Sequence, residues 1–159
     1  MRWLALLALC AVAYLAYLDM GHAMAQGKLW VRPIILKGEI DALSWVRENT
    51  PERTVFVTDI VAGEMIMGYT LREGVLGGDW AVIPNVLKRM SDVQYGIYNS
   101  SDADAACAMA KEYGAKYVWV PERDIFAGYE WNWHSDVFND ARRFRRVFGN
   151  DDVTIYEVM

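Results

Sequence analysis

The order of hydrophobic and polar positions divides the chain into two parts. Residues 3–18 read WLALLALCAVAYLAYL, an apolar run that contains no charge. From residue 39 onward, short β-branched runs alternate with segments in which apolar residues recur every three or four positions, the respective patterns of buried strands and amphipathic helices. The chain is therefore divided into an apolar segment over residues 1–25, a linker over 26–38 and a folded domain over 39–159.

Periodicity and turn residues predict the individual elements of the domain. Helices are expected over 39–49, 62–71, 85–90, 103–113 and 136–148, and strands over 54–58, 74–76, 115–120 and 153–158. Alternation of this kind predicts an α/β layered domain with a mostly parallel sheet flanked by helices, preceded by one N-terminal apolar helix. The short turn at 149–152 would let the last strand run antiparallel at an edge of that sheet.

The apolar segment has two interpretations. As a signal peptide, it has a positive start at Arg2 and a small-residue cleavage site at Ala23-Met24-Ala25. As a membrane anchor, residues 3–18 enter the lipid bilayer, with tilt or local thinning compensating for a run shorter than the ~20 residues that span it. The anchor predicts a single-pass membrane protein with its domain outside the cytoplasm, and the signal predicts secretion after cleavage following Ala25.

Composition narrows the classes of function. Sixteen Lys and Arg against 21 Asp and Glu leave a net charge of −5, which argues against nucleic acid as a partner. Two Cys exclude a disulfide scaffold and a Cys-rich zinc site, and two His leave little for a histidine-based metal centre. No cofactor is expected. The sequence contains no glycine-rich phosphate loop, HExxH or GxSxG motif, so no catalytic residue is assigned.

Carboxylates gather where the first predicted strands end. Asp59 follows the strand over 54–58, Glu64 lies one to two helical turns later, and Asp79 follows the second strand. Ligands of α/β domains bind at this end of a sheet, so the three could form a site for a cation or for sugar hydroxyls. The alternative is a helix cap beside solvated carboxylates.

An unusual aromatic stretch reads Tyr129-Glu130-Trp131-Asn132-Trp133-His134. Exposed aromatic faces beside hydrogen-bonding groups suit a carbohydrate, a lipid headgroup or a protein partner. Trp131, Trp133 and His134 are therefore candidate binding residues, and the alternative is a loop whose aromatic side chains cover the edge of the core. Four arginines at 142–146 are expected to form a basic face of the last helix, either solvated or against anionic lipids.

Four sequence blocks occur in an order typical of one family. ALSWVRENTPE at 42–52 is followed by R-x-x-V-x-G-G at 72–78, by S-D-A-x-x-A and KEYGAKYVWV within 101–120, and by RVFxNDDVTIYEV at 146–158. This order resembles the extracytoplasmic C-terminal region of GT-C class membrane glycosyltransferases, a group that includes the archaeal oligosaccharyltransferase catalytic subunit. The resemblance covers about residues 38–159, and it puts the apolar run where the last transmembrane helix of the family stands.

The resemblance implies a role for this chain and also indicates which activities it is not expected to have. The oligosaccharyltransferase subunit carries a WWDYG motif after the first strand that helps to bind the acceptor, and here only Asp59 and Gly63 can correspond to it. Its catalytic carboxylates lie in loops of the membrane part, so this chain is not expected to transfer sugars alone. The first hypothesis is docking or substrate positioning beside a polytopic glycosyltransferase. The second is a free-standing exported domain that binds a glycan or cell-surface component, and a weaker third is an enzyme that uses Asp59, Glu64 and His134.

Overall fold

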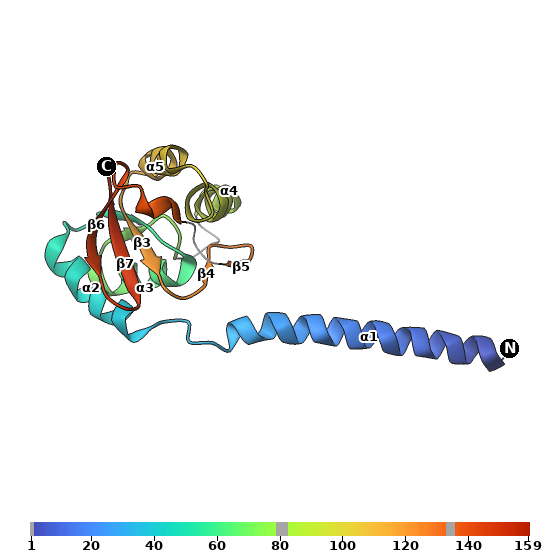
Figure 1. The fold of residues 1–159 in the computed structure, drawn as a ribbon. Coiled ribbons are helices and arrows are strands. Elements are labelled where there is room, and N and C mark those ends of the chain that lie inside the picture. Colours follow the sequence, from blue (N-terminus) through green and yellow to red (C-terminus); the bar gives the residue numbers. More distant parts are fainter. Residues whose placement is uncertain (1, 79–82, 133–135) are drawn as a thin grey trace. The chain divides into compact units, whose positions relative to one another are not determined.

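The computed structural model describes residues 2–78, 83–132 and 136–159, in two compact units divided after Ile34. The first unit contains α1 (Arg2–Trp30), which confirms the expected N-terminal apolar helix (Figure 1). The helix continues through Asp19 and Gly21 into the expected linker. Its segment Leu6–Lys28 is long and apolar enough to cross a membrane, and none of that segment is buried.

The second unit, residues 35–159, contains all the strands that the structure describes. Its elements are, in chain order, α2 (Lys37–Asn49), β1 (Val55–Val57), α3 (Ile60–Thr70), β2 (Glu73–Gly74), α4 (Val86–Ser91), the π-helix η1 (Asp92–Tyr98), α5 (Ala103–Glu112), β3 (Ala115–Pro121), β4 (Ile125–Phe126), β5 (Trp131–Asn132), the 3₁₀-helix η2 (Asp136–Asn139), β6 (Phe144–Gly149) and β7 (Val153–Val158). Local signals in the sequence explain where several of the helices begin or end. Asp59 and Asp102 accept backbone hydrogen bonds as N-caps of α3 and α5, and Gly114 follows α5 with a φ of +69°.

Five strands form one mixed sheet in the order β2-β1-β3-β7-β6. Figure 1 shows β3, β7 and β6 side by side. β1 pairs in parallel with β2 and β3, whereas β7 runs antiparallel to both β3 and β6. Four strands thus share one direction, and the α/β fold with a mostly parallel sheet is confirmed. The antiparallel strand is β7, as the sequence suggested. The expected edge position is wrong, because β7 lies inside the sheet and β2 and β6 are its edge strands.

The predicted helix over 136–148 is wrong. This segment forms η2 and then β6, which makes a hairpin with β7. Asn150 Oδ1 accepts hydrogen bonds from the backbone N of Asp152 (2.9 Å) and of Val153 (3.0 Å), which stabilises the turn between the two strands. The spacing of the apolar residues fits a helix, but two alternating runs around a Gly-Asn-Asp-Asp turn are equally a hairpin signal.

The expected basic helix face is therefore absent from the described residues. Arg142 binds Asp140 at 2.6 Å, Arg143 binds Asp104 and Arg145 binds Glu157 across the β6–β7 hairpin. Three of the four arginines expected on that face thus have a carboxylate partner.

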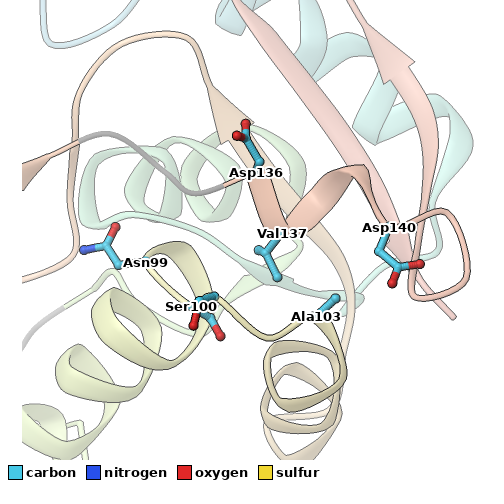
Figure 2. A pocket seen from close by; sticks show the side chains of 7 residues that line it. Asn99, Ser100, Ala103, Asp136, Val137 and Asp140 are labelled. Atoms are coloured by element: carbon cyan, nitrogen blue, oxygen red, sulfur yellow. The ribbon is translucent and has the colours of Figure 1, made fainter.

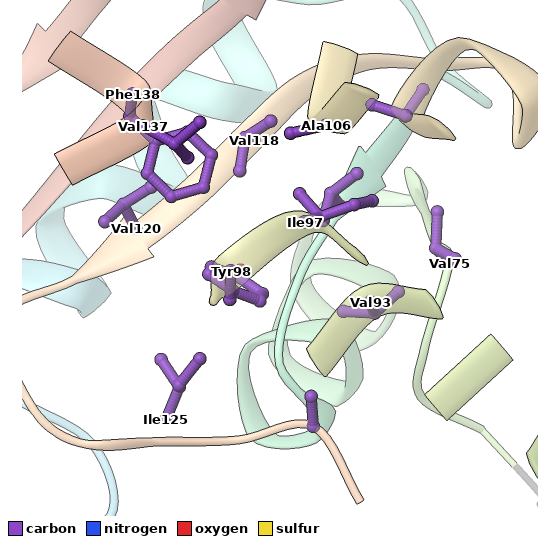
Figure 3. Packing of buried hydrophobic residues seen from close by; sticks show 14 of the residues in the cluster. Val75, Val93, Ile97, Tyr98, Ala106, Val118, Val120, Ile125, Val137 and Phe138 are labelled. Carbon is purple, nitrogen blue, oxygen red and sulfur yellow. The ribbon is translucent and has the colours of Figure 1, made fainter. Parts of the chain in front are cut away.

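Helices cover both faces of the sheet and enclose two hydrophobic clusters. On one face, α2 and α3 pack on Phe56, Trp119 and Ile155. On the other face, η1, α5 and η2 pack on Val118 and Val120, as Figure 3 shows. Trp119 and its neighbours in β3 point to opposite faces because side chains alternate along a strand. The sheet is thus the middle layer of three, and its carboxyl edge is where the candidate site begins.

Candidate functional site

Asp59 lies at the carboxyl end of β1, as its sequence position predicted. The chain leaves Val57, and Asp59 then caps α3 by accepting a hydrogen bond from the backbone N of Ala62 at 2.8 Å. The side chain of Asp59 is fully buried. A buried carboxylate needs a cation or several donors, so its other contacts decide what this position does.

Arg123 supplies that cation from the segment that follows the neighbouring strand. β1 and β3 are parallel, so the segment after β3 meets the segment after β1 at one edge of the sheet. Both terminal nitrogens of Arg123 donate to Asp59, with Nη2 3.3 Å from Oδ1. Nε and Nη2 also donate to the two carboxylate oxygens of Glu39 in the first turn of α2, each at 2.9 Å.

The group formed by Glu39, Asp59 and Arg123, here called the buried triad, is closed to solvent. Glu39 also accepts hydrogen bonds from the backbone N of Leu36 (2.8 Å) and from Trp119 Nε1 (3.3 Å). Burial alone would lower the pKa of Arg123, but the two carboxylates together raise it, so the guanidinium stays charged. The triad therefore ties α2, the start of α3 and the end of β3 together.

Sequence reasoning identified only one member of the triad. Arg123 follows a strand and Glu39 opens a helix, and each position is ordinary for an exposed charge. The predicted parallel sheet was the feature that could have indicated this contact, because it brings residues after β1 and after β3 to one sheet edge. A ligand site at Asp59 remains a prediction, and in this structure both carboxylate oxygens of Asp59 point to protein donors.

Glu64 lies apart from the triad, on the exposed side of α3. Its Oε1 accepts a hydrogen bond from the backbone N of Gly78 at 2.5 Å, which joins α3 to the loop after β2. The loop and α3 approach closely, because a Cβ on Gly63 would lie 1.9 Å from the carbonyl oxygen of Leu76. Asp79, the third member of the expected acidic cluster, lies outside the described residues.

The described part of the aromatic stretch, residues 129–132, contributes to the turn and to strand β5 of the small β4–β5 hairpin. Trp131 is half-buried and stacks on Phe126 with ring centroids 5.1 Å apart, so it belongs partly to the edge of the core. Trp133 and His134 lie outside the described residues, and their expected role stays a prediction.

Two tyrosines, Tyr95 and Tyr129, form an exposed aromatic surface, here called the tyrosine platform. Their rings stack at 5.9 Å, and each side chain is 47% exposed. The Tyr129 hydroxyl donates to the carbonyl of Leu87 at 2.7 Å, and its backbone N donates to the buried Gln94 at 3.1 Å. Burial and the nearby Glu130 carboxylate raise the pKa of Tyr95. An aromatic face beside a carboxylate can bind a polyhydroxylated ring, and sequence reasoning missed Tyr95 because it comes from η1.

An open cavity of about 440 Å³ lies between the N-terminus of α5 and η2, as Figure 2 shows. Asn99, Ser100 and Ser101, a triplet that fits a glycosylation acceptor, line one side, and Asp136 and Asp140 line another. Asp140 is engaged by Arg142. Within residues 2–78, 83–132 and 136–159, no group of three or more His, Cys, Asp or Glu side chains is placed to hold a metal ion.

Comparison with known proteins supports the fold. The chain matches no family model and no curated protein. Among solved structures it is similar to the C-terminal globular domain of an oligosaccharyltransferase from Archaeoglobus fulgidus, with a TM-score of 0.55 and 16% identity. The match covers 80% of this chain and 100% of that domain. The resemblance inferred from the four sequence blocks is thereby confirmed at the level of the fold.

Proposed function

We propose that this chain is a membrane-anchored, extracytoplasmic domain that docks onto or positions substrate for a membrane glycosyltransferase, without catalysing the transfer itself. The observation that carries the proposal is the fold match, which extends over the whole of the solved oligosaccharyltransferase domain. The family that the sequence resembles holds this domain outside the cytoplasm, beside its membrane part.

The properties of α1 support the anchoring half of the proposal. The exposed apolar surface of this 29-residue helix is unfavourable in water, whereas a lipid bilayer would cover it. The buried triad bears on the statement that the chain does not catalyse the transfer itself. It occupies Asp59, the residue that can correspond to the acidic position of the acceptor-binding motif of the family, in an ion pair with Arg123. The proposal therefore assigns a structural role to Asp59 and no role in catalysis.

The first experiment is the intact mass and N-terminal sequence of the native protein in membrane and soluble fractions. The proposal expects a membrane-bound species near 18.2 kDa that begins at or near Met1 and resists carbonate extraction. A soluble species that begins at Gln26 would refute the anchor. Protease protection in sealed vesicles of both orientations then reports on which side of the membrane the domain lies.

A pull-down from native membranes tests the docking role. The expected result is co-purification of a polytopic membrane glycosyltransferase with the wild-type chain. A matched variant without residues 1–25, carrying a secretion signal in their place, separates binding through the domain from binding through α1. Recovery of no polytopic protein with either chain would contradict the docking role.

The tyrosine platform favours a second candidate, a free-standing domain that binds a glycan. The double substitution Tyr95→Ala and Tyr129→Ala should then abolish binding on a glycan array, with little change in the unfolding temperature, because both rings are half exposed. Tyr69→Ala, which removes an exposed tyrosine from α3, is the matched control. Wild-type-like binding by the double variant would eliminate this candidate.

A further inference from the structure

The polar residues inside the membrane-length segment of α1 lie on one narrow face. Between Leu6 and Lys28 they are Asp19, His22 and Gln26, here called the polar stripe. At 3.6 residues per turn, positions 19, 22 and 26 fall within an arc of about 60°. Ala16 and Ala23 border the same arc, and the rest of the circumference is apolar up to Lys28.

The tryptophans at the two ends of α1 indicate the depth of this stripe. Trp3 and Trp30 are both exposed, and 27 residues of helix separate them by about 40 Å. This length equals the thickness of a bilayer with its interfacial regions, where tryptophan is enriched. With one tryptophan at each interface, Asp19 lies about 4 Å from the bilayer centre.

A carboxylate at that depth must face protein or a water-filled cavity. Charged side chains in the hydrocarbon region are expensive to hold there, and they pair with one another or with backbone carbonyls inside a helix bundle. Among the described residues, α1 alone is long and apolar enough to cross a membrane. The part of the chain that the structure describes thus offers no second membrane helix to cover Asp19, so the covering group is sought on a second copy of the chain or on another protein.

The charge of the stripe selects between two kinds of occupant. A second copy of α1 packed in parallel on this face would place Asp19 against Asp19, and like charges in low dielectric repel strongly. A helix with a basic side chain at the same depth would instead neutralise Asp19. His22, one turn from Asp19, supplies a further hydrogen-bonding group.

We infer that the polar stripe is a docking face for a transmembrane helix of a polytopic membrane protein, one that carries an Arg or Lys near the bilayer centre. The inference rests on the proposed membrane anchor and specifies how that anchor selects its partner. A helix that served only to hold the domain at the membrane would not need Asp19, because any apolar side chain would insert more favourably.

Site-directed photocrosslinking in native membranes tests the inference with pairs of positions at equal depth. The probe, p-benzoylphenylalanine, is placed at Ala16 or Ala23 beside the stripe. The comparison positions are Tyr17 and Met24, which lie on average about 150° around the helix from Asp19. We expect adducts with one polytopic protein from Ala16 and Ala23, at a yield at least tenfold higher than from Tyr17 and Met24.

Substitutions in the same full-length chain test the role of the charge. Asp19→Leu should lower the adduct yield from Ala23 at least tenfold, and Asp19→Asn, which keeps a hydrogen-bonding group, should lower it less. Asp41→Asn removes an exposed carboxylate from α2 and should leave the yield unchanged. The protein in the adduct should contain a transmembrane helix with a mid-membrane Arg or Lys.

The remaining outcomes separate this inference from the proposed function. Equal yields from both faces, or an unchanged yield with Asp19→Leu, in a chain that is membrane-embedded from its N-terminus would overturn the docking face and leave the anchor standing. Adducts between two copies of the chain would overturn it in favour of self-association. A chain that begins at Gln26 would overturn the anchor and the docking face together.

Discussion

Replacing Arg123 with methionine tests whether the buried triad holds the domain together. Methionine keeps most of the length of the side chain and removes its charge. The substitution deletes all four contacts that Arg123 makes to carboxylate oxygens and leaves Glu39 and Asp59 buried without a cation. Both carboxylates are fully buried, and only 6% of the Arg123 side chain is exposed.

The expected loss is large because buried charges cannot recover their hydration. Removing one partner of a buried ion pair costs about 3–5 kcal/mol. The free energy of unfolding of a domain of this size is on the order of 5–15 kcal/mol. Arg123→Met should therefore remove a large share of the stability, whereas Arg145→Met, which removes an exposed partner of Glu157, should have little effect.

Equilibrium urea unfolding of the detergent-solubilised full chain, followed by tryptophan fluorescence, measures this loss. Trp119 reports from inside the network because its Nε1 donates to Glu39. A triple variant, Glu39→Gln, Asp59→Asn and Arg123→Met, removes all three charges and keeps acceptors for the helix caps. We expect it to regain at least half of the lost stability. If the triple variant is no more stable than Arg123→Met, uncompensated charge is not the cause.

Two further predictions concern close packing and a surface carboxylate. Gly63→Ala should destabilise the domain by about 1–3 kcal/mol, because its Cβ would collide with a main-chain carbonyl. Gly68→Ala, in open space on the same helix, should instead stabilise the domain by about 0.5–1 kcal/mol. Equal effects of the two substitutions in thermal or urea unfolding would contradict the packing argument. Hydrogen bonds from Arg142 lower the pKa of Asp140 to about 2, so the stabilisation from this pair is present above the unfolded-state pKa near 4 and is lost as the pH falls toward 2. An NMR titration should show the Asp140 midpoint rising from about 2 toward the unfolded-state value near 4 in Arg142→Ala. An unshifted midpoint would refute Arg142 as the cause of the lowered pKa.

Local sequence signals identified most of the elements that surround the candidate site. Asp59 and Asp102 cap helices, and Gly114 ends one, because each effect depends on a few neighbouring residues. The buried strands β1 and β3 were visible as continuous apolar runs. The ordered motif blocks also pointed to the fold that the solved oligosaccharyltransferase domain shares.

The segment at 136–148 shows where local reasoning fails. Its apolar spacing fits a helix, but pairing with β7 along the hairpin outweighs that intrinsic preference. The error changed the interpretation of Arg143 and Arg145, which are paired with carboxylates from other parts of the chain.

The sequence by itself determined the apolar helix, the α/β alternation and the edge of the sheet at which Asp59 lies, because these follow from hydrophobic period and short-range capping. Only the tertiary structure decided which charges meet. Arg123 lies 84 residues from Glu39 and 64 from Asp59 along the chain, and Tyr95 reaches Tyr129 from a different element. Such pairs depend on strand order and helix packing, which are set by the burial of the whole core and not by the residues that form the pair.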